Sequence, residues 1–317
     1  MQKMNRFQFL AGLLALGTAL PAAAQGSQPT LTVQHARGQA QVPAAPRRVV
    51  VYDLASLDTM QALGLPVAGV PRAGFPAYMA GYADARYAVA GTLFEPDYEA
   101  LSRIRPDLIV VAGRSAARYD ALSRIAPTLD LSVGARDMLG DMQRNVAALA
   151  SLWGRQAEGE RLMRQVRGEV EALRAQAAQA GPGLLVLAID TNLSAQPPGA
   201  RFGLLHDVLG VSPALPPDPA RPRGVPLKME QIAKIDPQWL YVIDRNAGTG
   251  TTATKEGKPV TPSKVLFDND LIRGTTAARK GQVVFLDPQI WYLLGSAGPQ
   301  AMRANVAQIR AALASAR

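Results

Sequence analysis

Short apolar runs alternate with helical patterns through most of the chain. Runs rich in Val, Ile and Leu that are bounded by Gly, Pro or polar residues predict strands. Such runs lie at residues 48–53, 66–71, 87–92, 108–113, 128–133, 184–190, 239–245 and 283–287. Apolar positions at helical spacing predict helices at 54–63, 98–104, 119–125 and 300–313. The alternation of strand and helix indicates an α/β fold with parallel sheets that helices cover on both faces.

A long helical stretch interrupts this alternation between residues 136 and 180. It is rich in Ala, Leu, Arg, Gln and Glu, it ends at Gly181-Pro182-Gly183, and Gly154 is a candidate break within it. A periodic segment of this length is either more than one helix or an element that spans two domains. We therefore expect an N-terminal α/β lobe over 25–135, a helical linker over 136–180 and a C-terminal α/β lobe over 181–317. A stiff linker predicts small lobe movements on binding.

One motif occurs in both halves of the chain. Residues 99–114 match residues 230–245: in each copy a glutamate opens a helix, a proline follows the helix, and a strand ends on an arginine. Glutamate, proline and arginine are each displaced by 131 positions between the copies. The repetition predicts two similar Rossmann-like lobes with a ligand cleft between them. The alternative is two chance copies of a common helix–proline–strand turn.

The first 24 residues predict export from the cytoplasm. Lys3 and Arg6 precede an apolar run at 7–20 and a small-residue stretch that ends at Ala24. This order is typical of a signal peptide that is cleaved after about Ala24. No later segment offers the roughly 20 apolar residues that a membrane-spanning helix needs.

Cysteine content and charge narrow the compartment and the partner. The chain has no cysteine, so neither a disulfide nor a lipid-anchored cysteine is available, and we expect the periplasm of a Gram-negative cell. The formal charge of +9 falls to +7 once the two basic residues of the signal leave, which favours an anionic partner. The Lys and Arg residues form no polybasic run, so we expect no nucleic-acid partner.

Three arginines are candidate ligand contacts. Arg114 and Arg245 follow strands in the two copies of the motif, and Arg201 lies in a Gly/Pro-rich loop after another strand. Ligands of open α/β sheets bind outside the carboxyl ends of the strands. Three converging guanidinium groups suit a compact, multiply charged anion. The alternative for each arginine is a solvated or salt-bridged surface residue.

Metal and catalytic chemistry have fewer candidates. The Tyr292 hydroxyl is a hard oxygen ligand suited to iron(III), or else belongs to an aromatic residue of the core or rim. Only two histidines occur, His35 and His206, which argues against a carrier of bare zinc or manganese.

An exported α/β enzyme that acts on an anionic substrate remains an alternative. Its acid–base pair would have to come from aspartates at strand ends, and these are better explained as helix caps or as partners of arginines. The candidates are Asp53, Asp190, Asp244 and Asp287.

Three motifs carry a family resemblance that covers nearly all of the mature chain. They are residues 200–203 with 206–210 (ARFG and HDVLG), residues 242–246 (VIDRN), and residues 285–288 with 291–293 (FLDP and WYL). With these motifs the chain resembles the periplasmic binding proteins of catecholate (enterobactin-type) siderophore importers. The same cluster of ABC-importer proteins holds vitamin B12 and haem binders.

The resemblance implies a binding protein without catalysis or an intrinsic cofactor. It implies that Arg114, Arg201 and Arg245 surround the catecholate oxygens of the ferric complex, and that Tyr292 can coordinate the iron of a tetradentate siderophore. In related proteins a histidine before a glycine supplies a second iron ligand, and that position here is Arg223. Since an arginine does not coordinate iron, Arg223 becomes a possible fourth cation. A haem-binding protein of the same fold is the nearest alternative.

The resemblance also implies a partner in the membrane. In the wider cluster one glutamate on each lobe docks into the ABC-importer permease, and Glu99 and Glu230 occupy the matching places here. The alternative is that each glutamate only favours the first turn of its helix. A protein of this class usually works as a monomer.

Overall fold

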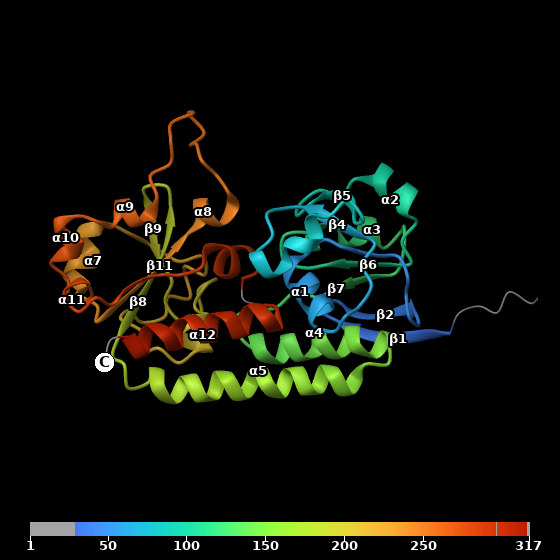
Figure 1. Ribbon diagram of the computed structural model, residues 1–317, viewed down its shortest axis with the longest axis horizontal. Coiled ribbons are helices and arrows are strands. Elements are labelled where there is room, and N and C mark those ends of the chain that lie inside the picture. Colours follow the sequence, from blue (N-terminus) through green and yellow to red (C-terminus); the bar gives the residue numbers. More distant parts are fainter. Residues whose placement is uncertain (1–28, 296, 316–317) are drawn as a thin grey trace, which may run out of the picture.

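The chain forms two α/β lobes side by side above a layer of long helices (Figure 1). The computed structural model describes residues 29–295 and 297–315, so the predicted signal peptide lies outside the described residues. Within this part, no helix is both long enough and apolar enough to cross a membrane.

The N-terminal lobe is built on a parallel five-stranded sheet of order β5-β4-β3-β6-β7. Its strands are β3 (Val49–Val51), β4 (Gly69–Arg72), β5 (Ala88–Thr92), β6 (Leu108–Val111) and β7 (Thr128–Asp130). Its helices are α1 (Leu54–Ala62), α2 (Tyr98–Ile104) and α3 (Tyr119–Leu122), with 3-10 turns η1 (Ala77–Ala83) and η2 (Ala116–Arg118). The strands and helices predicted for this half are present.

A β-hairpin that the sequence analysis missed precedes this sheet. It consists of β1 (Thr30–His35) and β2 (Gly38–Pro43), which pair antiparallel. The turn uses Gly38 at φ +119°, a backbone angle that favours glycine. Val33, His35 and Val42 are its buried residues, too few to mark the strands by apolar content alone.

The C-terminal lobe has a five-stranded sheet of order β10-β9-β8-β11-β12. Its strands are β8 (Gly183–Ile189), β9 (Asn192–Ala195), β10 (Val225–Leu227), β11 (Trp239–Asp244) and β12 (Val283–Phe285). Its helices are α6 (Leu204–Asp207), α7 (Met229–Ile235), α8 (Arg245–Thr249), α9 (Ser263–Leu266), α10 (Asp270–Arg273), α11 (Thr276–Arg279) and the π-helical turn η3 (Gln289–Leu293). This sheet is mixed, because β9 runs antiparallel to both of its neighbours.

The repeated motif has the same structure in both lobes. In each copy a seven-residue helix, α2 or α7, ends on a left-handed residue directly before the proline: Arg105 at φ +50° and Asp236 at φ +47°. The strand that follows, β6 or β11, is fourth in its sheet. The lobes are therefore structurally equivalent at the motif, which favours a true repeat over a chance match.

The helical stretch at 136–180 is two helices, α4 (Met138–Leu152) and α5 (Gln156–Ala177), with Gly154 at φ +67° between them. The first of them packs on the N-terminal lobe, where Asn145 Nδ2 donates to the Leu131 carbonyl at 2.6 Å. The second helix and the C-terminal helix α12 (Pro299–Ser315) run beneath both lobes (Figure 1). Arg303 Nε donates to both Glu169 carboxylate oxygens, at 3.0 and 3.1 Å, and joins these two helices. The helices α5 and α12 together therefore link the two lobes.

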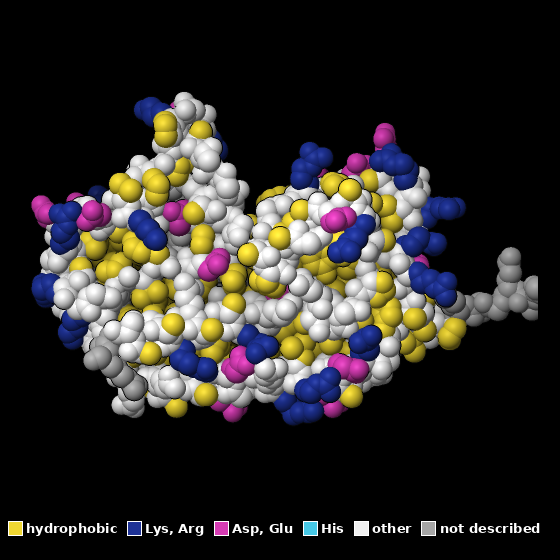
Figure 2. Space-filling model, viewed as in Figure 1, with side chains coloured by type: hydrophobic (Ala, Val, Ile, Leu, Met, Phe, Trp, Pro, Cys, Tyr) yellow, Lys and Arg dark blue, Asp and Glu magenta, His cyan; other side chains and the backbone are white. Residues whose placement is uncertain are grey.

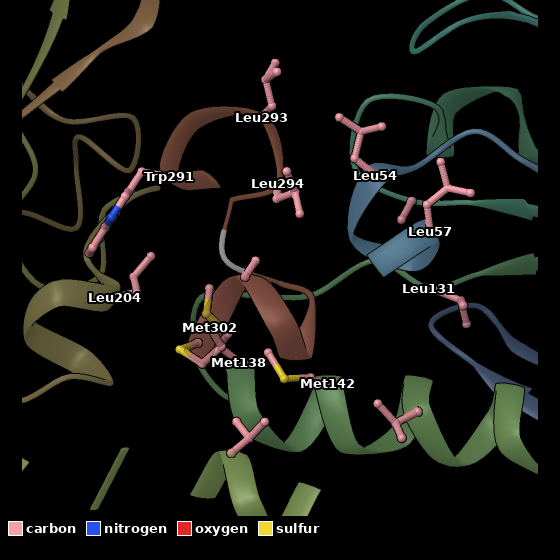
Figure 3. Packing of buried hydrophobic residues seen from close by; sticks show 14 of the residues in the cluster. Leu54, Leu57, Leu131, Met138, Met142, Leu204, Trp291, Leu293, Leu294 and Met302 are labelled. Carbon is pink, nitrogen blue, oxygen red and sulfur yellow. The ribbon is translucent and has the colours of Figure 1, made fainter. Parts of the chain in front are cut away.

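One hydrophobic core continues from lobe to lobe along this link. Figure 3 shows Leu293 and Leu294 between Trp291 on the side of the C-terminal lobe and Leu54 and Leu57 on α1. Trp291 is fully buried, and its Nε1 donates to Gln308 Oε1 at 3.1 Å. Continuous packing of this kind resists large relative movement of the lobes.

A buried carboxylate makes the stability of the fold depend on pH. Burial raises the pKa of Asp58 to about 6, although hydrogen bonds from Tyr78 and from α12 act to lower it. The pKa of Asp58 in the folded chain lies above its ordinary value. The stability that Asp58 contributes to the fold is therefore complete below its unfolded pKa, and it is lost as pH rises through its folded pKa. The shift corresponds to about 3 kcal/mol.

We expect the unfolding free energy of the unsubstituted chain, relative to Asp58→Asn, to fall by about 3 kcal/mol between pH 4 and pH 7.5. Urea unfolding at a series of pH values measures the difference. Asp270→Asn, whose side chain is fully exposed, is the matched control and should show no such change. A difference between the chain and Asp58→Asn that is constant over this range would contradict the expectation.

Candidate ligand-binding site

A cavity of about 700 Å³ lies between the two lobes. Its walls come from the ends of β3, β6 and β7, from the start of α4, from two loops of the C-terminal lobe, and from the segment that runs from η3 to α12. The lining residues are Asp53, Ala55, Ala112, Gly113, Arg114, Leu131, Val133, Ala135, Met138, Arg201, Phe202, Arg223, Tyr292, Leu293, Leu294, Gly295 and Ala297. Figure 2 shows the notch that separates the lobes on one face of the molecule.

Arg114 reaches across the cavity from the N-terminal lobe. It follows β6 after Gly113, whose φ of +50° turns the chain at this point. Its Nη1 donates to the Leu293 carbonyl at 2.9 Å and its Nη2 to the Tyr292 carbonyl at 3.0 Å. Since a guanidinium has five N–H groups, these two contacts leave donors for a ligand.

Two arginines enter the cavity from the C-terminal lobe on loops that are tied together. The Arg201 N–H donates to the Pro222 carbonyl at 2.8 Å, one residue before Arg223. Gln196, almost wholly buried, donates from Nε2 to the Arg223 carbonyl at 3.2 Å. Both arginine side chains are exposed to solvent in the cleft. The loops therefore hold two cations side by side.

Tyr292 lies between cations of the two lobes. The Arg114 Cζ is 5.6 Å from the centre of its ring, and the Arg201 Cζ is 5.4 Å from it. The Phe202 ring packs at 5.7 Å, centre to centre. Attraction between a guanidinium and an aromatic face orients the ring at the cavity wall.

The cavity carries an excess of positive charge. Burial, and next the Arg201 guanidinium, lower the pKa of Arg114. Asp53 is the acidic residue of the wall, and burial raises the pKa of its carboxyl against the opposing effect of hydrogen bonds to Ser56 and of the Arg114 charge. Among the ion pairs of the described residues, none includes Arg114, Arg201 or Arg223. Three cations against one carboxyl suit a multiply charged anion.

Arg245 does not join the other arginines at this wall. It is the first residue of α8, where its Nη1 donates to Asn246 Oδ1 at 3.1 Å, and it is not among the described residues that line the cavity. The structure thus brings together Arg114, Arg201, Arg223 and Tyr292 but leaves Arg245 outside this group.

The remaining candidates lie away from the cavity wall. Glu99 in α2 and Glu230 in α7 are exposed, and Glu99 is 3.8 Å from Arg103. His206 is buried with its Nδ1 2.9 Å from the Val211 carbonyl, and it packs within its own lobe. In the described part of the chain, no group of three or more His, Cys, Asp or Glu residues can hold a metal ion.

The aspartates at strand ends act largely as helix caps. Asp53 accepts from the Ser56 N–H at 2.8 Å and caps α1, and Asp244 accepts from the Ala247 N–H at 2.9 Å and caps α8. The predicted capping role is confirmed for these two residues. Their hydrogen bonds provide no acid–base pair.

Sequence reasoning missed the apolar half of the cavity. Leu131 and Val133 line it from the N-terminal lobe, Met138 lines it from the start of α4, and Leu294 lines it from the end of η3. Their place in the sequence could have identified them as lining residues, because Leu131 and Val133 follow the end of β7 and Met138 is the first residue of α4. The cavity therefore offers an apolar wall and a cationic wall, a combination that fits an aromatic ligand with negative charge.

The chain belongs to the periplasmic binding protein family, whose model matches residues 49–290. It is 31% identical to the petrobactin-binding protein YclQ of Bacillus subtilis, over 97% of this chain and 98% of that protein. It is 28% identical to the ferric-anguibactin-binding protein FatB of Vibrio anguillarum, over 83% of this chain and 81% of that protein. Both relatives are named as binding proteins.

Solved structures share the two-lobed fold. The crystal structure of YclQ superposes with a TM-score of 0.83 over 90% of this chain and 99% of that one. The periplasmic catecholate-siderophore binding protein VctP of Vibrio cholerae, 30% identical, superposes with a TM-score of 0.82 over 89% of this chain and 100% of that one. The predicted architecture of two α/β lobes is confirmed.

Proposed function

We propose that this chain is a periplasmic substrate-binding protein that captures an iron(III)–catecholate siderophore complex and delivers it to an ABC importer. The names of its relatives support a ferric siderophore as the ligand class. The observation that carries the catecholate assignment is the convergence of Arg114, Arg201 and Arg223 on one interlobe cavity. Six catecholate oxygens around iron(III) give a trianion, and three permanent cations balance it.

In this proposal the chain binds and does not catalyse. The cationic residues contact the catecholate oxygens, and Leu131, Val133 and Phe202 contact the ring faces. The N-terminal lobe, the helical linker and the C-terminal lobe correspond to residues 25–135, 136–180 and 181–317, and the exported monomer begins after about Ala24.

Titration of the mature chain with ferric tris-catecholate and bis-catecholate complexes tests this function. Tryptophan fluorescence reports binding, because Trp291 directly precedes Tyr292 at the cavity. We expect sub-micromolar binding of at least one complex. Failure of both complexes, together with a Soret band on addition of haem, would replace the proposal with haem binding in the same fold.

The Tyr292 hydroxyl is the proposed ligand for a coordination position of iron(III) that a tetradentate siderophore leaves open. We expect Tyr292→Phe to abolish the shift of the charge-transfer band that accompanies binding of the ferric bis-catecholate complex, because phenylalanine has no oxygen to coordinate the metal. The ferric tris-catecholate complex is the internal control, since its iron is saturated and its spectrum should not change. An unaltered band shift in the variant would remove Tyr292 as an iron ligand.

We propose that Glu99 and Glu230 dock the loaded protein onto the permease. Helices α2 and α7, which carry them, lie at the outer parts of the two lobes (Figure 1). Equivalent positions in the repeated motif suit a transporter with two similar halves.

A further inference from the structure

Asp58 of α1 makes contacts that join the two lobes. Its side chain is wholly buried. Its Oδ1 accepts from the Gln300 N–H at 2.9 Å, and its Oδ2 accepts from the Ala301 N–H at 2.9 Å. These N–H groups belong to the first turn of α12, where a helix has no backbone acceptors of its own. A carboxylate of the N-terminal lobe therefore caps a helix whose far end lies beneath the C-terminal lobe.

Residues 292–295 and 297, which precede α12 in the chain, form one wall of the ligand cavity. It contains Tyr292, Leu293 and Leu294, and it crosses from the C-terminal lobe to the N-terminal lobe (Figure 3). The Arg114 guanidinium holds its upstream part through the carbonyls of Tyr292 and Leu293. Asp58 holds its downstream end through α12. Two residues of one lobe thus fix a wall that the chain brings from the other.

The approach of Asp58 to α12 is close enough to require a glycine. A Cβ atom at position 298 would lie 2.5 Å from Asp58 Cγ, nearer than real Cβ contacts allow. Gly298 and Asp58 are 240 positions apart in the chain. A side chain at 298 would push the Asp58 carboxylate away from α12 without any change to the amino acid at position 58.

The groups around Asp58 require an acceptor there. The Tyr78 hydroxyl of η1 donates to Oδ2 at 2.6 Å, so three donors meet one carboxylate. Two further titratable groups interact electrostatically with the Asp58 carboxylate. They are Tyr82 of the same turn and Asp53 at the start of α1. An amide cannot replace a carboxylate here, because its NH₂ group would face a donor. Burial disfavours the ionised form, so the carboxylate contributes geometry at the expense of fold stability.

We propose that Asp58 is a positioning residue of the ligand cavity, which sets the place of Tyr292 and its neighbours relative to Arg114 by clamping the first turn of α12. The effect of Asp58 on ligand affinity rests on the proposed function, whereas its effect on the distance between the lobes does not. Loss of the clamp removes the hydrogen bonds that hold the first turn of α12 to α1, while the bonds to Arg114 and the packing in the shared core remain. The two lobes then sample a wider range of separations.

The test uses Asp58→Asn, Gly298→Ala and Tyr78→Phe, with Asp270→Asn as an exposed control. Because the chain contains no cysteine, spin labels at Val89→Cys and Val265→Cys, both exposed and on different lobes, report the interlobe distance. We expect Asp58→Asn and Gly298→Ala to broaden the distance distribution and to weaken binding of the ferric tris-catecholate complex at least about tenfold. The Asp270→Asn control should match the unsubstituted chain in both measurements.

Unchanged distances and affinities within twofold for both Asp58→Asn and Gly298→Ala would overturn the proposal. If Asp58→Asn does not fold, Gly298→Ala and Tyr78→Phe carry the test, since each retains the carboxylate. If the unsubstituted chain binds no catecholate complex, the proposed function fails, while the label distances still decide the role of Asp58.

Discussion

Arg201→Ala combined with Arg223→Ala is expected to weaken binding of the ferric tris-catecholate complex by about 100-fold, or about 3 kcal/mol. In the proposed function each side chain donates charge-assisted hydrogen bonds to a trianion. Both residues line the cavity, and a backbone hydrogen bond joins their loops. Both side chains are exposed to solvent, so their loss leaves the core intact. Titration calorimetry measures the change in the dissociation constant.

If Arg201 and Arg223 contact the ligand directly, loss of two positive charges elsewhere on the surface should not reproduce the loss of affinity. The matched control is Arg279→Ala with Lys280→Ala, which removes two exposed cations at α11 and should leave the affinity within about twofold. Salt provides a second check, because raising it from about 0.05 M to about 0.5 M should weaken binding to the unsubstituted chain more than to the cavity variant. An equal loss of affinity in both double variants would contradict a local arginine site.

Glu99→Arg combined with Glu230→Arg is expected to reduce iron uptake at least about tenfold while leaving ligand affinity unchanged. The Glu99 side chain is 90% exposed, and no residue of α2 or α7 is among the described residues that line the cavity. Reversal of charge at a docking surface places like charges together, which costs several kcal/mol at a protein interface. Uptake of the ferric complex by cells that depend on this chain measures the effect, together with calorimetry of the purified variant.

A charge reversal elsewhere separates docking from general surface charge. Glu160→Arg on α5 changes a side chain that is 71% exposed and lies outside the repeated motif, so uptake should be retained. Uptake at the unsubstituted level in the Glu99/Glu230 variant would leave the two residues with the simpler role of acidic groups in the first turn of a helix.

The repeated motif could be predicted because its determinants are local. A helix, a left-handed residue, a proline and a buried strand follow within 16 positions of each other, and the same order reappears 131 positions later. The antiparallel strands β9 and β10 could not be predicted in this way. They have four and three residues, and Pro226 lies inside β10, where a proline argues against a strand.

The two related arginines show where sequence equivalence fails. Gly113 adopts φ +50° before Arg114, and the chain turns so that the guanidinium reaches Tyr292 and Leu293. Asp244 instead caps α8, so Arg245 becomes a helical residue beside Asn246. The residue before each arginine therefore separates an arginine that lines the cavity from one that is not among the described lining residues. The role of Arg223 depended on family resemblance, because nothing in its local pattern points to a cleft.

The clamp at Asp58 has no sequence signal at all. Its partners Gln300 and Ala301 are more than 240 positions away, and the residue reads as a polar position in an otherwise apolar helix. Only the fold brings the carboxylate to the start of α12.

Titration calorimetry of the mature chain with the tris-catecholate complexes of iron(III) and gallium(III) tests whether the arginine-lined cavity binds a trianionic complex. The two complexes have the same charge and similar size, so recognition by the three arginines predicts sub-micromolar binding of both, with one complex per chain and affinities within about threefold. Absence of binding by either complex, or binding of the metal-free siderophore as tight as that of its complexes, would contradict the account.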